Sequence, residues 1–232
     1  MAWFQEWFGE EYLELYSYRD STEAKQQVAF FCSRFGKLRG PVLDLACGNG
    51  RHVSELHAAG YRAVGCDLSL ILLQSGSTEY GPMPLVRADM RSLPFCNGSF
   101  AGLVNFFTSF GYFSDEEENA QVLREMSRVM RDGAVFLFDY LNVAHELQRM
   151  TDRERRGDVT IERWYDSSDH SFNKRITIGQ KRYLERVRGY DLDEITAMFT
   201  ASGLVIEDAF GDFDGSKYRR SSPRLILGGR KR

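Results

Sequence analysis

The sequence predicts an α/β protein built on a mostly parallel β-sheet. Two observations predict this class: short apolar segments alternate with amphipathic helical segments over residues 41–139, and a polar residue stands at or near the end of each apolar segment. Right-handed crossovers place the carboxyl ends of such strands at one edge of the sheet. We therefore expect the functional site at that edge, where open α/β sheets bind their ligands.

Turn and cap signals divide this region into elements. Gly60 suits the position just after a helix that begins at Arg51, and Ser114 to Glu117 form a capping box for the helix before the last of these strands. The five strands are expected at 42–46, 62–66, 84–87, 101–107 and 134–138.

The pattern changes after Asn142. Residues 158–188 alternate polar and apolar side chains, which predicts an insertion of two or three antiparallel strands. A helix over 191–201 and a strand pair at 204–206 and 225–227 complete the chain. We expect one domain over residues 1–232, with an antiparallel β insertion over 143–190 that covers the substrate side.

The first residues of the chain are unusually aromatic. Trp3, Phe4, Trp7 and Phe8 recur at spacings of three and four, which predicts an amphipathic helix within an N-terminal helical arm or cap over residues 1–38. Such an arm either packs over the core or forms an aromatic lid over a ligand.

Composition excludes several classes of protein. Thirty Lys and Arg against 33 Asp and Glu give a formal charge of −3, which argues against an obligate nucleic-acid coat. No apolar run approaches the roughly 20 residues that span a bilayer, and the N-terminus lacks signal-peptide features, so a cytoplasmic protein without a membrane partner is expected. The four cysteines show no CxxC spacing, so no metal site is predicted.

The central motif is the segment from Asp44 to Gly50, which starts in a strand and ends at a helix. Small residues there let the backbone approach a ligand, and the helix start offers unpaired N–H groups. Asp67, at the end of the next strand, can accept hydrogen bonds from two ribose hydroxyls. The pair indicates a site for an adenosine-type cofactor.

Two features separate this motif from a dinucleotide site. The third glycine of G-x-G-x-x-G is missing, because Val53 occupies its place. Asp44 also precedes the loop, and a buried carboxylate repels a pyrophosphate but attracts an ammonium or sulfonium group. The sequence therefore favours a cationic ligand, with a nicotinamide-dependent oxidoreductase as the rival enzyme class.

Several segments together resemble the class I S-adenosylmethionine-dependent methyltransferases. Residues 42–50 resemble motif I of that family, 65–69 its second motif, 87–90 its adenine-contacting segment, and 123–138 its helix-to-strand stretch. The resemblance covers about residues 40–140. It implies a Rossmann-like, seven-stranded methyltransferase sheet in which the last strand is antiparallel.

The sequence also departs from the family pattern. Ala46 replaces the first glycine of motif I, and Asp132 replaces a common proline, but neither change removes the expectation of cofactor binding. The segments 107–113 and 211–216 and the predicted insertion resemble a bacterial small-molecule branch that includes sugar N-methyltransferases.

By position, the resemblance implies a cofactor site for S-adenosylmethionine and its product S-adenosylhomocysteine. Asp44 and the following loop would flank the methionine part, Asp67 would hold the ribose, and Asp89 would accept from the adenine amino group. Tyr18 and Arg19 would reach the methionine carboxylate, although Arg19 also fits a surface arginine. The implied binding residues are Tyr18, Arg19, Asp44, Ala46, Cys47, Gly48, Gly50, Asp67, Leu68, Ala88, Asp89, Met90, Asn105 and Phe106.

The resemblance further implies methyl transfer to nitrogen or oxygen of a small-molecule acceptor. Candidate catalytic groups near the strand ends are Tyr112, Asp139 and His145. The insertion carries excess positive charge, which suits either a solvated β face or a cover for an acidic acceptor. An RNA methyltransferase and a non-catalytic scaffold of the same fold remain the alternatives, and the chain is expected to be a monomer or a homodimer.

Overall fold

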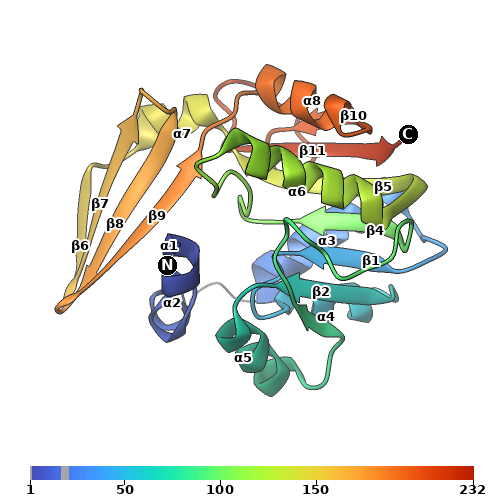
Figure 1. Cartoon of the computed structure of the whole chain (residues 1–232), viewed down its shortest axis with the longest axis horizontal. Coiled ribbons are helices and arrows are strands. Elements are labelled where there is room, and N and C mark those ends of the chain that lie inside the picture. Colours follow the sequence, from blue (N-terminus) through green and yellow to red (C-terminus); the bar gives the residue numbers. More distant parts are fainter. Residues whose placement is uncertain (1, 17–20) are drawn as a thin grey trace.

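A computed structural model describes residues 2–16 and 21–232 and contains two β-sheets (Figure 1). The seven strands of the larger sheet are β1 Val42–Leu45, β2 Ala63–Asp67, β3 Leu85–Arg87, β4 Phe100–Asn105, β5 Met130–Leu141, β10 Leu204–Phe210 and β11 Arg224–Lys231. Their order is β10-β11-β5-β4-β1-β2-β3. Only β11 runs against its neighbours β5 and β10, so the predicted sheet with an antiparallel last strand is confirmed.

Helices cover both faces of the larger sheet. On one face lie α3 Ser21–Phe35, α4 Arg51–Ala58 and α5 Leu70–Tyr80, and on the other lie α6 Glu116–Val129 and α8 Leu192–Ala201. The short α7, Val143–Arg149, follows β5. Helix α6 is capped by Asp115, whose carboxylate accepts from the Glu117 amide at 2.9 Å, and not by the predicted Ser114 box.

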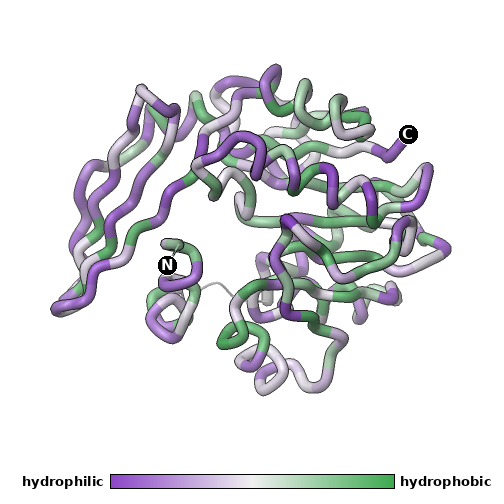
Figure 2. The backbone as a smooth tube through the Cα atoms, in the orientation of Figure 1, coloured by the Kyte–Doolittle hydropathy of each residue, from purple (hydrophilic) through white to green (hydrophobic). Residues whose placement is uncertain are grey.

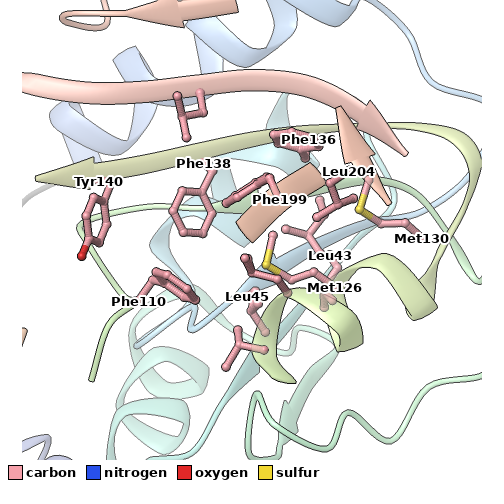
Figure 3. Packing of buried hydrophobic residues seen from close by; sticks show 14 of the residues in the cluster. Leu43, Leu45, Phe110, Met126, Met130, Phe136, Phe138, Tyr140, Phe199 and Leu204 are labelled. Carbon is pink, nitrogen blue, oxygen red and sulfur yellow. The ribbon is translucent and has the colours of Figure 1, made fainter. Parts of the chain in front are cut away.

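The larger core fills the space between the sheet and α6 and α8. Met126 from α6 and Phe199 from α8 meet Leu43, Phe136 and Phe138 from the strands, and all five are at most 1% exposed (Figure 3). Burying side chains of this size stabilises the fold by roughly 1.5–3 kcal/mol each. Figure 2 shows the matching hydropathy, with apolar strands inside the main sheet and more polar strands in the smaller one.

The insertion forms a second, four-stranded antiparallel sheet that stands beside the main one (Figure 1). Its strands are β6 Arg153–Arg156, β7 Val159–Asp166, β8 Ser171–Ile178 and β9 Lys181–Arg188. Residues 158–188, for which the sequence predicts two or three strands, contain three of them, β7, β8 and β9. The fourth strand, β6, precedes that range and was not predicted, because this short edge strand is rich in arginine and carries no apolar alternation.

The aromatic N-terminal segment forms two short helices instead of the single predicted helix. They are α1 Trp3–Trp7 and α2 Glu10–Leu15, separated at Gly9, whose backbone is extended. Trp7 is 1% exposed because it packs on Ile161 and Ile176 of the smaller sheet. The segment from Trp3 to Tyr16 is here called the arm. Its position is thus fixed by packing against residues far away in the sequence.

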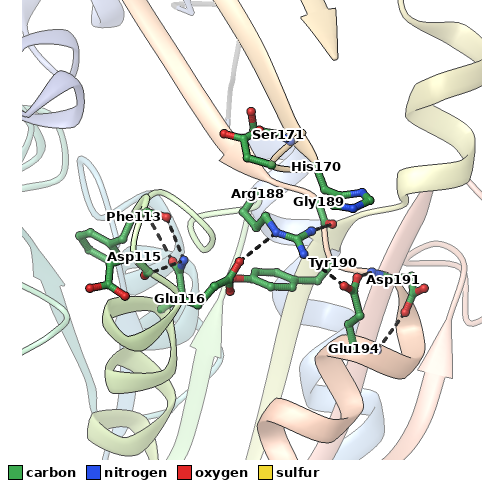
Figure 4. Close-up of polar contacts among 12 residues, drawn as sticks. Phe113, Asp115, Glu116, His170, Ser171, Arg188, Gly189, Tyr190, Asp191 and Glu194 are labelled. Atoms are coloured by element: carbon green, nitrogen blue, oxygen red, sulfur yellow. Dashed lines mark hydrogen bonds and ion pairs between the residues drawn. The ribbon is translucent and has the colours of Figure 1, made fainter. Parts of the chain in front are cut away.

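Arg188, at the end of β9, joins the smaller sheet to the rest of the chain (Figure 4). Its guanidinium forms ion pairs with Glu116 of α6 at 3.0 Å and Glu194 of α8 at 3.1 Å. Its carbonyl accepts a hydrogen bond from the buried Tyr140 hydroxyl. These contacts fix the base of the insertion to both helices on one face of the main sheet.

Within the described ranges, no helix is both long and apolar enough to cross a membrane. The cytoplasmic location, the oligomeric state and the extent of the single domain stay predictions.

Two neighbouring glycines of β11 allow a test of this packing. A Cβ on Gly229 would lie 2.0 Å from the Val205 carbonyl oxygen and 2.7 Å from the Phe136 ring, whereas one on Gly228 would make contacts of 3.6 Å or more. We expect Gly229→Ala to lower the free energy of unfolding by about 1–3 kcal/mol and Gly228→Ala to change it by less than about 0.5 kcal/mol, measured by denaturant unfolding. Equal losses in both variants would contradict the described register of β11.

Candidate active site

Two adjoining cavities open at the carboxyl ends of the central strands, with volumes of about 370 and 330 Å³. The first, here called the adenosine cavity, is lined by Asp67, Asp89 and Tyr112 among others. The second, the methionine cavity, is lined by Asp44 and Arg51. Residues shared by both walls are Tyr12, Ala46, Gly48, Leu72, Phe107 and Ser109.

The turn between β1 and α4 forms the floor shared by both cavities. Ala46, Gly48 and Gly50 have positive φ angles of 57°, 58° and 77°. Glycine adopts this conformation freely, whereas a left-handed alanine is strained by about 1–2 kcal/mol. Ala46 therefore keeps the backbone path of the glycine it replaces, and the turn retains its shape.

Close backbone approach around this turn depends on two glycines that sequence reasoning did not select. A Cβ on Gly76 of α5 would lie 1.8 Å from the Asn49 carbonyl oxygen, and one on Gly65 of β2 would lie 2.7 Å from the Cys47 sulfur. Both positions let neighbouring elements press against the turn. No local sequence motif includes these two glycines, so the need for glycine at both positions is seen only in the three-dimensional packing.

Asp44 places a buried carboxylate beside the methionine cavity. The residue is 1% exposed, and its Oδ2 has no hydrogen-bond partner among the residues that the structure describes. Burial, and next the charge of Asp67, raise the pKa of Asp44 well above its ordinary value, while Arg51 opposes the shift. An orphaned buried carboxylate is stabilised by a cation, so this residue fits the ammonium or sulfonium end of S-adenosylmethionine.

Asp67 ties the end of β2 to the turn after β1. Its Oδ2 accepts from the Gly48 amide at 2.8 Å, and its Oδ1 accepts from the Ser69 amide at 2.8 Å. Burial raises the pKa of Asp67, although these backbone donors oppose the shift. A carboxylate has about four acceptor positions, so lone pairs remain for two ribose hydroxyls.

Asp89 lies in the same cavity wall as Ala88, Met90 and Leu68. Burial acts to raise the pKa of Asp89, but hydrogen bonds and charge from Arg91 outweigh it and leave the pKa below its ordinary value. The Arg91 guanidinium lies 2.5 Å from Asp89 and also pairs with Glu118. Asp89 is thus a fixed, ionised acceptor of the type predicted for an adenine amino group.

Of the other predicted cofactor residues, some line a cavity, some do not, and some lie outside the described residues. Cys47 and Phe106 line the methionine cavity. Gly50 caps α4, and Asn105 lies below the turn, where its amide nitrogen donates to the Leu45 carbonyl at 2.8 Å; neither lines a cavity wall. Tyr18 and Arg19 lie outside the described residues.

His52 is held neutral beneath the methionine cavity. Burial, and next the charge of Arg51, lower the pKa of His52 well below its ordinary value. Its Nε2 lies 2.6 Å from the Gln27 amide oxygen, and its ring stacks on Phe106 with the centroids 4.3 Å apart. Arg51 lies over the Phe107 ring at 4.3 Å. These contacts support the floor of the cavity.

The three predicted catalytic residues are not brought together. Tyr112 lines the adenosine cavity, but burial raises the pKa of its hydroxyl well above the ordinary value, which suits a hydrogen-bond donor better than a base. Neither Asp139 nor His145 lines either cavity wall. For these two residues the structure corrects the expected placement.

Asp139 instead fixes the loop after β4. Its Oδ2 accepts from the Phe107 amide at 2.8 Å and its Oδ1 from Arg224 Nε at 2.6 Å. Arg224 Nη2 donates to the Thr108 hydroxyl at 3.1 Å. Because Phe107 and Thr108 have positive φ angles of 62° and 57°, this clamp holds a strained loop against the cavity.

Several residues of the adenosine cavity have no motif in the sequence. The arm contributes Trp3, Phe4, Phe8 and Tyr12, which agrees with the lid interpretation of its aromatic pattern. Glu146 of α7, Glu185 of β9 and Arg224 of β11 complete the wall. Their positions follow from the assembly of distant elements, so spacing along the chain could not select them.

The sheet order, the turn after β1 and the carboxylate at the end of β2 agree with the pattern that the class I methyltransferase resemblance implies. Residues 42–133 match the family model described as a methyltransferase domain. A demethylmenaquinone methyltransferase from Corynebacterium kroppenstedtii is 38% identical over 94 residues, which are 40% of this chain and 38% of that protein. Another curated relative is matched over 63% of its length, so the chain spans less than two thirds of both.

Solved methyltransferase structures share the whole fold. An S-adenosylmethionine-dependent methyltransferase from Clostridium acetobutylicum aligns with a TM-score of 0.78 at 19% identity, covering 95% of this chain and 96% of that one. CalS10 from Micromonospora echinaspora, described as an amino pentose methyltransferase with bound S-adenosylmethionine, aligns with a TM-score of 0.68 at 18% identity, covering 96% and 97%. At such identities the likeness concerns the fold.

Residues 42–133 therefore match a methyltransferase domain, and the chain shares its fold with solved S-adenosylmethionine-dependent methyltransferases. These findings confirm the predicted fold and the predicted resemblance to the S-adenosylmethionine-dependent methyltransferases.

The buried Asp44 carboxylate gives a prediction with a definite sign. Because its folded-state pKa is raised, its contribution to stability is fully present below the ordinary Asp pKa of about 4 and is lost as the pH rises toward the folded-state value. We expect Asp44→Asn to weaken S-adenosylmethionine binding at least about tenfold by calorimetry. The difference in Tm, variant minus wild type, should increase from pH 4 to pH 8.

Asp193→Asn, on the exposed start of α8, is the matched control and should change neither quantity. A pH-independent Tm difference for Asp44→Asn would show that Asp44 is not the strained buried charge described here.

Proposed function

We propose that the chain is an active S-adenosylmethionine-dependent methyltransferase that methylates nitrogen or oxygen of a small-molecule acceptor. The observation that carries this proposal is the pair of adjoining cavities at the strand ends. One contains the unpartnered Asp44 carboxylate, and the other joins the ribose-type carboxylate Asp67 to an aromatic chamber beyond Tyr112.

The cofactor half of the site is supported by the donor and acceptor set. Asp44 would face the cationic methionine end, Asp67 the ribose and Asp89 the adenine, while the turn at Ala46 and Gly48 permits close backbone approach. S-adenosylmethionine, when bound, supplies a methyl group on a positively charged sulfur, which leaves as a neutral thioether. The protein's main task is therefore to align the acceptor atom, for which orientation is worth up to about 7–11 kcal/mol.

The enclosed walls of the cavity support the proposal of a small-molecule acceptor. The arm and β9 close the chamber with Trp3, Phe8 and Val187, and Trp3 packs edge-on against Tyr112 with the centroids 4.9 Å apart. Walls of this kind exclude water and leave room for a small molecule but not for a folded RNA. The likeness to an amino pentose methyltransferase supports the same acceptor size.

Calorimetry with S-adenosylmethionine and S-adenosylhomocysteine, with NADH as control, tests the cofactor assignment. We expect both methionine-derived ligands to bind and NADH not to bind. Asp67→Ala should weaken binding at least about tenfold, because it removes the ribose acceptor and the Gly48 contact together. Asp158→Ala, an exposed position of the insertion, should bind like the wild type.

Transfer of a labelled methyl group to a panel of small molecules tests the activity. Absence of cofactor binding in a folded sample would instead favour the non-catalytic scaffold. A steeply salt-dependent affinity for RNA would favour the RNA methyltransferase.

A further inference from the structure

The adenosine cavity is lined by more acidic than basic side chains. Among the described residues that line the adenosine cavity, Asp67 and Asp89 belong to the cofactor half, which leaves Glu146 and Glu185 toward the acceptor. The one cation in this lining is Arg224, and its charge is already compensated by Asp139 at 2.6 Å. Since Glu185 is likewise paired, with Lys174 at 3.0 Å, the uncompensated charge among these described acceptor-side residues is the negative charge of Glu146.

The two glutamates differ in what they contact. Glu185 accepts a hydrogen bond from Trp7 Nε1 at 2.5 Å and pairs with Lys174 at 3.0 Å, so it is engaged in holding the arm. The Glu146 carboxylate has no hydrogen bond or ion pair with any described residue. It therefore lines the cavity as a half-buried acceptor that receives no donor from the described residues.

The position of Glu146 places it at the acceptor end of the cavity. It lies on α7, five residues beyond the end of β5, on the same sheet edge as the loop of Phe107 and Thr108. Aromatic rings stand in the same wall: Phe8 stacks on Tyr112 with the centroids 5.9 Å apart. Aromatic faces attract cations, so the apolar walls and the free carboxylate select the same kind of ligand.

We propose that Glu146 binds the ammonium group of an amine acceptor and takes its proton before methyl transfer. The inference rests on the proposed function and names the acceptor class within it. The N–H bond breaks, the proton moves to the Glu146 carboxylate, and the electron pair stays on nitrogen. The neutral amine is then the nucleophile that attacks the methyl group, as a protonated amine cannot.

The groups that influence this proton transfer are few. Around the cavity they are Tyr112, Glu185 of β9 and Arg224 of β11, together with the cofactor-side carboxylates of Asp67 and Asp89. On α7 itself, His145 precedes Glu146 and Arg149 follows it. None of these supplies a second free carboxylate at the acceptor end.

The test uses matched amine and alcohol probes with methyl-labelled S-adenosylmethionine: benzylamine against benzyl alcohol, and D-glucosamine against D-glucose. We expect transfer to an amine and none to the alcohols. Glu146→Gln should lower kcat/KM for the amine about a hundredfold at pH 7 and leave S-adenosylmethionine affinity within twofold. Its rate should then recover about tenfold per pH unit up to the pKa of the amine, with a shallower profile in the wild type.

Glu117→Gln, on the exposed side of α6, is the matched control and should behave like the wild type. Methylation of the alcohols instead of the amines, or a Glu146→Gln variant with wild-type rate and pH profile, would overturn the proposal. The proposal would also be overturned if the amines were not methylated and did not bind to the S-adenosylhomocysteine complex in a way that depends on Glu146. Failure of the wild type to bind S-adenosylmethionine would instead refute the proposed function.

Discussion

The hydrogen bond from the Gly48 amide to the Asp67 carboxylate joins the turn after β1 to the end of β2, at 2.8 Å. The geometry of the candidate site depends on this contact. It brings the buried charge of Asp67 close enough to Asp44 to raise the pKa of the latter. It also fixes the backbone of the turn, against which Gly65 and Gly76 allow β2 and α5 to pack. The cofactor half is thus one connected unit of strand ends and backbone amides.

A second clamp organises the acceptor half. Asp139 joins the loop after β4 to Arg224 of β11, so the last strand of the chain stabilises a strained loop that begins more than a hundred residues earlier. This contact explains why Asp139 is buried at 1% exposure and does not reach the cavity. Carboxylates at strand ends therefore have two different positions in this protein: Asp67 lines the cavity, whereas Asp139 holds the backbone beside it.

The sheet and the cofactor half could be predicted because their signals are local. Asp44 lies near the end of a short apolar strand, Asp67 and Asp89 follow two others, and parallel strands bring such residues to one edge. The arm could not be placed in this way, because Trp7 meets Glu185 across 178 residues of sequence. The sequence also selected His145, whereas its neighbour Glu146 lines the cavity: successive helical residues point about 100° apart, and the sequence does not show which one faces inward.

The two halves of the candidate site come from different parts of the chain. The match to the methyltransferase family ends at residue 133, while the acceptor chamber takes Trp3 and Phe8 from the arm and Glu185 and Val187 from the inserted sheet. Substitutions in those two segments leave the turn at Gly48 and the Asp67 contact untouched. Under the proposed function, the acceptor chamber can therefore change through the arm and the insertion, while the turn at Gly48 and its contact with Asp67 stay the same.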